Sequence, residues 1–222
     1  MRKYRHAIFD MDGTIIDSMP VWKNLGKDYL TKKGVKAPKN LNEIISAMSM
    51  TESANYFRKE LKISNCPERI ISDMNQLIKD KYKYEIPLKP YVKEYLSYLQ
   101  RNNVVMCVAT ATPVQLAEVV LKRLEVLQYF SFVVCCDEVG TGKSKPDIYY
   151  LALKKMKASI ADTIVYEDAD YAIRTAKSAG FYTIGVYDEY AYDQKKEIQL
   201  LCDRYIDSFE CLLELDSLSA GN

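Results

Sequence analysis

The stretch HAIFDMDGTIID, residues 6–17, decides the fold predicted for this chain of 222 residues. Its apolar run at 7–9 predicts a short buried strand. Asp10 and Asp12 follow this run, and Gly13 supplies the backbone freedom for a sharp exit. Carboxylates at such a place are unfavourable unless a cation or a proton compensates them, so the stretch favours a reactive site. A plain strand followed by an Asp-Gly turn is the alternative that this stretch alone leaves open.

Beyond residue 87 the sequence alternates between strand-like and helix-like segments, the pattern of α/β proteins. Strands are predicted at 104–109, 132–136, 163–166, 182–186 and 205–206. Helices are predicted at 92–101, 113–124, 147–156, 169–179, 189–202 and 209–215. The predicted fold class is therefore α/β, with a doubly wound, Rossmann-like parallel sheet.

A long helical segment interrupts this pattern after the first strand. Between residues 15 and 87 only helical patterns occur, at 18–33, 41–48, 51–61 and 67–84. Gly34 follows the first of them as a stop signal, and Pro67 begins the last. We therefore expect an α/β core of residues 1–14 and 88–222, with an all-helical insert of residues 15–87.

Composition narrows the classes of function and of binding partner that the chain can have. A net charge of +1, with scattered basic residues, gives no electrostatic reason to expect nucleic acid or an anionic membrane as partner. The longest apolar runs are too short to span a bilayer, and no apolar targeting segment precedes the first strand, so a cytoplasmic protein is expected. None of the six cysteines forms a C-x-x-C pair, which favours reduced thiols over a zinc site or disulfides.

Candidate catalytic residues follow the predicted strands. The single histidine, His6, precedes a strand, so the chemistry is expected to rest on carboxylates, lysine and hydroxyls. In open α/β sheets, ligands bind beyond the carboxyl ends of the strands. The sequence places two carboxylates after the first strand, a hydroxyl after the second and two more carboxylates after the fourth. These residues are Asp10, Asp12, Thr110, Glu167 and Asp168.

A loop at 140–147 brings lysine to the same edge, through Lys143 and Lys145. Carboxylates, a hydroxyl and a lysine together predict a divalent cation with a phosphate. Mg²⁺ takes six oxygen ligands, and Asp10 and Asp168 can donate carboxylate oxygens while Asp12 donates its backbone carbonyl. The lysine adds positive charge, and Thr110 with nearby backbone N–H groups can bind phosphoryl oxygens.

In this order the residues resemble the four motifs of the haloacid dehalogenase-like hydrolase superfamily, over essentially the whole chain. The motifs are FDMDGT at 9–14, Thr110, Lys143 with Pro146-Asp147, and Glu167-Asp168. The insert resembles the family's C1-type cap, and the subgroup resembles β-phosphoglucomutase and phosphoglycolate-phosphatase-type enzymes. The resemblance implies that Asp10 is the nucleophile, forming an aspartyl-phosphate, and that Asp12 is the general acid and base.

The resemblance also implies two ligand sets. The metal set is Asp10, Asp12, Glu167 and Asp168, and the phosphate-binding set is Thr110, Ala111 and Lys143. The third motif departs from the usual Lys-Pro-x-Pro-Asp, and alignment on Pro146-Asp147 favours Lys143 over Lys145 as the active-site lysine. The presence of Asp12 favours phosphoryl transfer over dehalogenation, because a halide leaving group needs no proton.

The cap is expected to select the substrate through Asp17, Trp22, Met48, Ser49 and Met50. A phosphomutase needs a cationic site for the distal phosphate, and β-phosphoglucomutases carry an Arg in the cap turn where this chain has Met50. We therefore expect hydrolysis, with the phosphomutase as the alternative.

The expected function is Mg²⁺-dependent hydrolysis of small phosphate monoesters, such as sugar or metabolite phosphates. The expected partner is a small phosphorylated metabolite, and the chain is expected to be a monomer or weak homo-oligomer. A receiver-type signalling module that accepts a phosphoryl group is a distant alternative, because such a domain would not need a long helical insert. A catalytically silent binding protein is disfavoured by the intact motifs.

Overall fold

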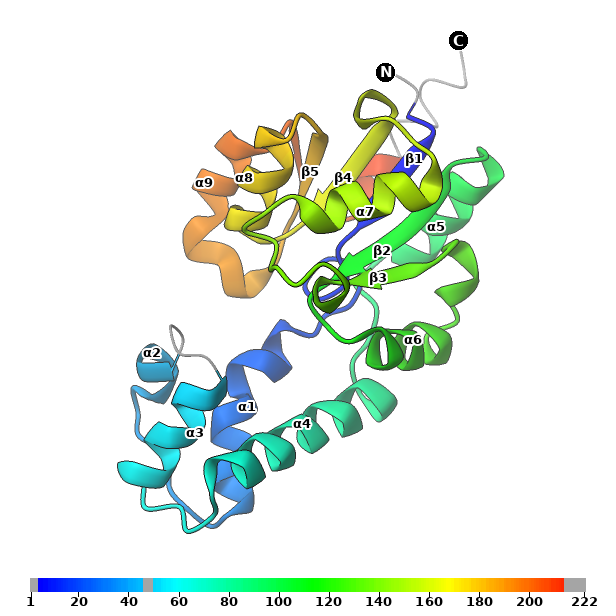
Figure 1. Ribbon diagram of the computed structural model, residues 1–222. Coiled ribbons are helices and arrows are strands. Elements are labelled where there is room, and N and C mark those ends of the chain that lie inside the picture. Colours follow the sequence, from blue (N-terminus) through cyan, green and yellow to red (C-terminus); the bar gives the residue numbers. More distant parts are fainter. Residues whose placement is uncertain (1–3, 46–49, 214–222) are drawn as a thin grey trace. The chain divides into compact units, whose positions relative to one another are not determined.

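Six parallel strands form one sheet in the computed structural model of the chain, which describes residues 4–45 and 50–213 (Figure 1). Their bounds are β1 (His6–Phe9), β2 (Val105–Thr110), β3 (Val133–Cys135), β4 (Thr163–Glu167), β5 (Tyr182–Val186) and β6 (Arg204–Ile206). Each lies within a residue of its expected bounds. The predicted fold class, α/β with a doubly wound parallel sheet, is confirmed.

The strand order β3-β2-β1-β4-β5-β6 means that the chain builds the sheet outward from β1 in two directions. β2 pairs with one side of β1 and β4 with the other. The winding reverses between β1 and β4, the place where open α/β sheets bind ligands beyond their carboxyl ends. Because Phe9 of β1 is paired with Tyr166 of β4, the residues that follow them, Asp10 and Glu167, are neighbours.

Side chains alternate between the two faces of the sheet, and each face has its own apolar layer. On one face, Ile8 of β1, Cys107 of β2 and Val165 of β4 form a buried cluster with α7 and with Ala176 of α8. Figure 1 shows α7 and α8 against this face.

The opposite face carries aromatic side chains. Phe9 stacks on Tyr166 with ring centroids 4.2 Å apart, and the rings of Tyr95 and Phe209 pack against Tyr166. The short apolar strands are thus covered on both faces, as a parallel sheet requires.

The helices that accompany the sheet are α5 (Val92–Arg101), α6 (Val114–Arg123), α7 (Asp147–Met156), α8 (Asp170–Ser178) and α9 (Lys195–Leu201). The helix expected at 189–202 differs, because its first part is the 3₁₀ segment η4 (Glu189–Gln194). The Asp188 carboxylate accepts a hydrogen bond from the Tyr190 N–H at 2.8 Å, and Ala191 departs from helical geometry. The α-helix therefore starts only at Lys195.

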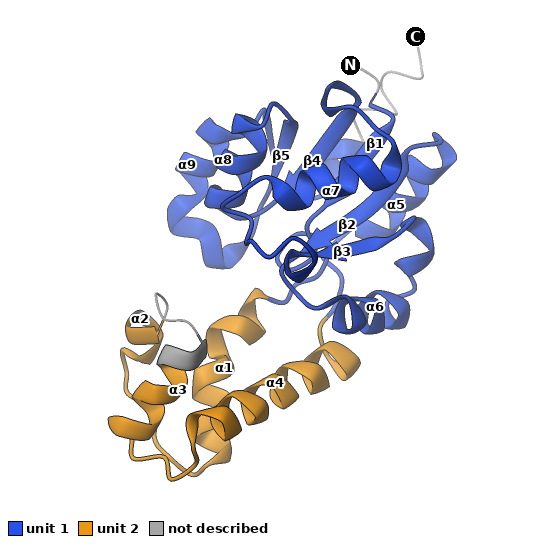
Figure 2. Ribbon diagram, in the orientation of Figure 1, with its two compact units in different colours: residues 1–18, 87–222 blue, residues 19–86 orange. Residues whose placement is uncertain are grey.

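A second compact unit, Met19–Ile86, contains helices and no strand among its described residues (Figure 2). The helices are α1 (Met19–Lys32), α2 (Leu41–Ile45), α3 (Met50–Lys59) and α4 (Pro67–Tyr84). Tyr29 of α1 and Phe57 of α3 stack with ring centroids 5.9 Å apart. Ile70, Met74 and Ile78 recur every fourth residue on the buried face of α4, which is the helical period.

The first unit comprises Met1–Ser18 and Pro87–Asn222, so residues 15–18 and residue 87 belong with the sheet. Backbone hydrogen bonds account for this, because the Asp17 N–H donates to Pro87 O and the Lys89 N–H donates to Ile15 O. Within the described residues, no helix combines the length and the apolar character needed to cross a membrane.

Candidate active site

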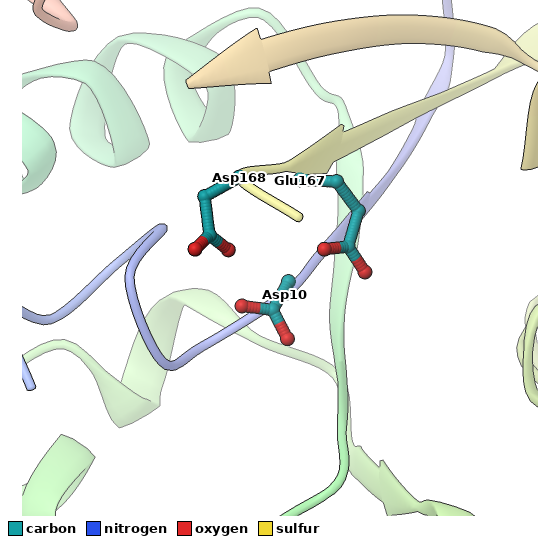
Figure 3. Close-up of side chains that lie close together, drawn as sticks. All are labelled: Asp10, Glu167 and Asp168. Atoms are coloured by element: carbon teal, nitrogen blue, oxygen red, sulfur yellow. The ribbon is translucent and has the colours of Figure 1, made fainter. Parts of the chain in front are cut away.

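Three acidic side chains meet at the carboxyl edge of the sheet, where the winding reverses (Figure 3). Asp10 follows β1, Glu167 ends β4 and Asp168 comes next. Each offers one carboxylate oxygen, and these atoms all lie within 4.8 Å of one another. All three residues are buried, so their charges are poorly solvated by water.

A buried lysine lies against this cluster. Lys143 comes from the loop at 140–147, which the Thr141 hydroxyl closes by donating to the Asp147 carboxylate at 2.8 Å. The Lys143 ammonium donates to Asp10 Oδ1 and, at 2.6 Å, to Glu167 Oε1. Its side chain is 4% exposed, whereas Lys145 is exposed to solvent. The structure therefore brings Lys143, and not Lys145, together with the acidic cluster.

The cluster has an excess of negative charge. Burial, followed by the charge of Glu167, raises the pKa of Asp168 to about 7. Burial also raises the pKa of Asp10 well above its usual range, although Lys143 opposes the change. For Lys143, burial lowers the pKa, but Asp10 and Glu167 more than offset this and hold it well above its ordinary value. The raised pKa values of Asp10, Asp168 and Lys143 all mean that additional positive charge is favourable in the site.

The chemistry of these groups fits a bound cation. Asp10 Oδ2 is buried and has no hydrogen-bond partner within the described part of the chain. An unpaired buried carboxylate oxygen is unfavourable, and a cation would satisfy it. The three clustered carboxylates are hard oxygen ligands of the kind that Mg²⁺ and Ca²⁺ prefer. The buried acidic cluster is therefore compatible with a divalent metal.

Two residues of the turn after β1 lie against the Asp168 carboxylate. The Thr14 hydroxyl donates to Asp168 Oδ1 at 3.1 Å. Gly13 has a φ of +86°, and a Cβ at this position would lie 2.2 Å from Asp168 Oδ2. Only glycine allows the backbone to approach the carboxylate this closely. The role of Gly13 as a sharp exit was predicted, whereas the contact of Thr14 was not.

Asp12 lies outside the acidic cluster and is held by two hydroxyl groups. Ser18 donates to Asp12 Oδ1 and Thr112 donates to Asp12 Oδ2, each at 2.7 Å. Asp12 is partly buried, unlike the three members of the acidic cluster. Sequence reasoning missed Ser18 and Thr112. The only available signal was the presence of hydroxyl residues just beyond the first two strands.

Thr110 and Ala111 lie at the carboxyl end of β2, as expected from the sequence. Thr110 is fully buried and its hydroxyl oxygen accepts a hydrogen bond from the Thr112 N–H at 3.0 Å, while Ala111 is exposed. This local bond orders the turn that follows the strand. The Thr110 hydroxyl keeps its own proton for another acceptor.

The expected substrate-selecting residues fall in three places. Asp17 is exposed and belongs to the unit with the sheet. Trp22 belongs to the second unit, where its indole N–H donates to the Tyr82 hydroxyl at 3.1 Å. Met48 and Ser49 lie outside the described residues, as does the side chain of Met50. Their proposed role therefore stays a prediction.

The fold and these side chains define the class of protein: an α/β protein whose doubly wound parallel sheet carries buried carboxylates and one buried lysine at its switch point. Residues 7–186 match the family model of the haloacid dehalogenase-like hydrolases, and the chain belongs to that family. The family prediction is thus confirmed.

Several relatives have names that describe an activity. A phosphorylated carbohydrates phosphatase of Thermotoga maritima is 28% identical over 174 residues, which cover 78% of this chain and 81% of that protein. A fructose-1-phosphate phosphatase of Escherichia coli is 26% identical, covering 83% of this chain and 97% of that one. A crystal structure from Thermotoga maritima, provisionally named a β-phosphoglucomutase, superposes with a TM-score of 0.84 at 26% identity, covering 96% and 99% of the two chains. The two phosphatases support the predicted enzyme class, a phosphatase of this family.

Proposed function

We propose that the chain is a Mg²⁺-dependent hydrolase of small phosphate monoesters that works through an aspartyl-phosphate. One observation carries the proposal: the buried Asp10, Glu167 and Asp168 lie together with Lys143 at one edge of the sheet, a combination of carboxylates and an ammonium that suits a cation and a phosphate. The two related phosphatases act, by their names, on phosphorylated carbohydrates and on fructose 1-phosphate. These names support sugar or metabolite phosphates as the substrate class.

Asp10 and Asp12 divide the chemistry in this proposal. An Asp10 carboxylate oxygen bonds to phosphorus while the ester oxygen leaves and takes a proton from Asp12. Asp12 then takes a proton from water, the water oxygen bonds to phosphorus, and the bond to Asp10 breaks to release inorganic phosphate. The hydroxyls of Ser18 and Thr112 support this role because they hold the Asp12 carboxylate in one orientation.

Lys143, Thr110 and the Ala111 N–H would bind the phosphoryl oxygens. Asp10, Asp168 and the backbone carbonyl of Asp12 would hold Mg²⁺, with Glu167 as the fourth member of the predicted set. When bound, the ion supplies positive charge that offsets the repulsion between the Asp10 carboxylate and the phosphate. The assignment is supported by Asp10 Oδ2, which is buried and has no hydrogen-bond partner among residues 4–45 and 50–213.

We further propose that the helical unit Met19–Ile86 selects the substrate. The unit has a core of its own, in which Tyr29 and Phe57 stack, and this supports a role separate from that of the sheet. The residues assigned to this task are Trp22, Met48, Ser49 and Met50 of the helical unit, together with Asp17 of the unit with the sheet. A monomeric or weakly oligomeric state and a cytoplasmic location stay predictions.

The test is a screen of phosphorylated metabolites that reads released phosphate with Mg²⁺, with Ca²⁺ and with chelator. We expect turnover with Mg²⁺ only, because the larger and looser shell of Ca²⁺ misplaces the phosphate. Asp10→Asn should lower turnover by about a thousandfold or more, since an amide cannot attack phosphorus. Asp162→Asn is the matched control, because this residue lies at the opposite edge of the sheet, just before β4. Full activity in chelator, or near-normal turnover of Asp10→Asn, would contradict the proposal.

A phosphomutase is the second candidate, favoured by the Thermotoga maritima structure named a β-phosphoglucomutase. Met50 disfavours it, because an apolar side chain offers no donor to a distal phosphate. Phosphorus NMR with β-glucose 1-phosphate, Mg²⁺ and a trace of glucose 1,6-bisphosphate separates the two. Hydrolysis predicts inorganic phosphate, whereas accumulation of glucose 6-phosphate would identify a mutase. Steady multiple turnover to either product would exclude a receiver-type module.

A further inference from the structure

Tyr149 is a buried residue that the proposed reaction does not use. It lies on α7, is 1% exposed and packs in the apolar layer between this helix and the sheet. Its ring contacts Phe181 with centroids 5.9 Å apart. Its hydroxyl, however, leaves this apolar layer and donates to Glu167 Oε1 at 3.0 Å. An aromatic side chain with two torsions thus connects the rigid core to the acidic cluster.

Glu167 Oε1 receives a second donor. The Lys143 ammonium lies 2.6 Å from the same oxygen and also donates to Asp10 Oδ1. The contacts therefore run in series from Tyr149 to Glu167, to Lys143 and to the proposed nucleophile Asp10. A carboxylate oxygen has two lone pairs, so these two donors fill the acceptor capacity of Oε1.

The hydrogen bond from the Tyr149 hydroxyl matters because two partners compete for the Glu167 carboxylate. It can hold the Lys143 ammonium, whose long stem is otherwise flexible, or it can turn toward the cation that Asp10 and Asp168 would bind. The Tyr149 hydroxyl favours the first arrangement, since its bond is made at the oxygen that Lys143 uses.

We propose that Tyr149 is a positioning residue that keeps Glu167 on Lys143 and limits its contribution to cation binding. The inference rests on the proposed function for its catalytic consequence. Without the hydroxyl, Glu167 Oε1 has one donor fewer and is a better ligand for the cation. Lys143 is then held less firmly against Asp10, which weakens its contact with the reacting phosphate.

The experiment compares Tyr149→Phe with Tyr95→Phe. Both tyrosines are buried, and the Tyr95 hydroxyl bonds to the Tyr166 hydroxyl at 2.7 Å on the aromatic face, so each variant loses a buried hydroxyl. Mg²⁺ affinity is measured by calorimetry without substrate, kcat by phosphate release at saturating Mg²⁺, and folding by thermal melting. For Tyr149→Phe we expect kcat about tenfold lower and Mg²⁺ binding about threefold tighter. For Tyr95→Phe we expect neither change.

Opposite changes in kcat and Mg²⁺ affinity are a result that general loosening of the fold would not give. The proposal is overturned if Tyr149→Phe matches Tyr95→Phe in both, or if it binds Mg²⁺ more weakly than the wild type. A second test adds Tyr149→Phe to a protein that already carries Glu167→Gln. In this background Tyr149→Phe should change kcat by less than about twofold, because the Tyr149 hydroxyl acts through the Glu167 carboxylate. An equal loss of kcat in both backgrounds would show that the effect does not pass through Glu167, and would also overturn it.

The calorimetric readout separates this inference from the proposed function. A wild-type chain that releases no phosphate refutes the proposed hydrolase, yet tighter Mg²⁺ binding by Tyr149→Phe would still support the role of Tyr149. A wild-type chain that binds no Mg²⁺ overturns both.

Discussion

Replacing Asp168 by Asn should stabilise the cation-free protein at alkaline pH and remove its response to Mg²⁺. Burial first, and then the charge of Glu167, raises the pKa of Asp168 from 3.8 to about 7. Asn keeps an oxygen that can accept the hydrogen bond of the Thr14 hydroxyl but carries no charge. The substitution therefore removes the unfavourable charge while it keeps the local hydrogen bond.

The magnitude follows from the difference in the pKa of Asp168 between the folded and unfolded chain. Because this pKa is raised on folding, its contribution to stability is full below about pH 4 and is lost as the pH rises to about 7 and slightly beyond. With about 1.4 kcal/mol for a difference of one in pKa, the Asp168 charge lowers the free energy of unfolding by about 1 kcal/mol at pH 4.5 and by about 4 kcal/mol at pH 8. Between these pH values the wild type should lose about 3 kcal/mol that the Asn variant keeps.

Urea denaturation in chelator at pH 4.5 and pH 8 measures this difference directly. At pH 8, Mg²⁺ at a hundred times its dissociation constant should then raise the free energy of unfolding of the wild type by about 2.7 kcal/mol and leave Asp168→Asn unchanged. If the wild type and the variant show parallel pH dependence in chelator, the assigned charge of Asp168 is wrong.

Asp203→Asn is a matched control with the opposite sign. Burial raises the pKa of Asp203, but bonds from Lys177 and from the Thr183 N–H and hydroxyl outweigh burial and leave the pKa lowered. Its carboxylate thus stabilises the fold above about pH 4, and this contribution is lost as the pH falls through the lowered pKa. At pH 8 the two variants should change the free energy of unfolding in opposite directions.

Three further predictions concern lysines. Lys143→Met should lower kcat for phosphate release by about a hundredfold or more, because it removes the buried charge beside Asp10, whereas the exposed Lys145→Met should stay within about twofold. Lys157→Gly should raise the free energy of unfolding by about 1 kcal/mol and the melting temperature by about 2–4 °C, since this residue caps the C-terminus of α7 in the left-handed region, with a φ of 53°. Lys89→Met should lower the free energy of unfolding in urea by about 3 kcal/mol, because it leaves the buried Asp188 carboxylate without its ammonium partner.

Each of these predictions has a result that contradicts it. A larger loss of kcat for Lys145→Met than for Lys143→Met would mean that the third motif is aligned wrongly. A Lys157→Gly variant that melts below the wild type would show that the lysine side chain contributes more than its backbone strain costs. An unchanged Lys89→Met variant would show that water, rather than the ammonium, solvates Asp188.

The strands could be predicted because each is a short apolar run bounded by polar or turn residues. The run expected at 182–186 is β5, with the same bounds, and the run at 163–166 is β4, which is one residue longer. Chain order and the rule for strand ends were then enough to expect Asp10 near Asp168. The 3₁₀ segment η4 was missed because the apolar period does not show the Asp188 side-chain bond that caps it or the departure of Ala191 from helical geometry.

The partners of the site residues could not be predicted, because they depend on packing between distant parts of the chain. Thr112 and Asp12 are 100 positions apart, and no periodicity links them. For Tyr149, the helical pattern indicates a buried face but says nothing of the direction of the hydroxyl. That hydroxyl reaches Glu167 because α7 packs on the face of the sheet that carries Ile8, Cys107 and Val165.

The excess of acidic charge is the feature of this fold that stability alone does not explain. Burial raises the pKa of both Asp10 and Asp168, so each would be easier to bury as a neutral amide. Lys143 compensates only part of the charge, since its ammonium contacts Asp10 and Glu167 but no contact with Asp168 is found among the described residues. Charges that oppose folding are retained where function requires them. Asp168→Asn separates the two requirements, because it should give a more stable protein that no longer gains stability from Mg²⁺.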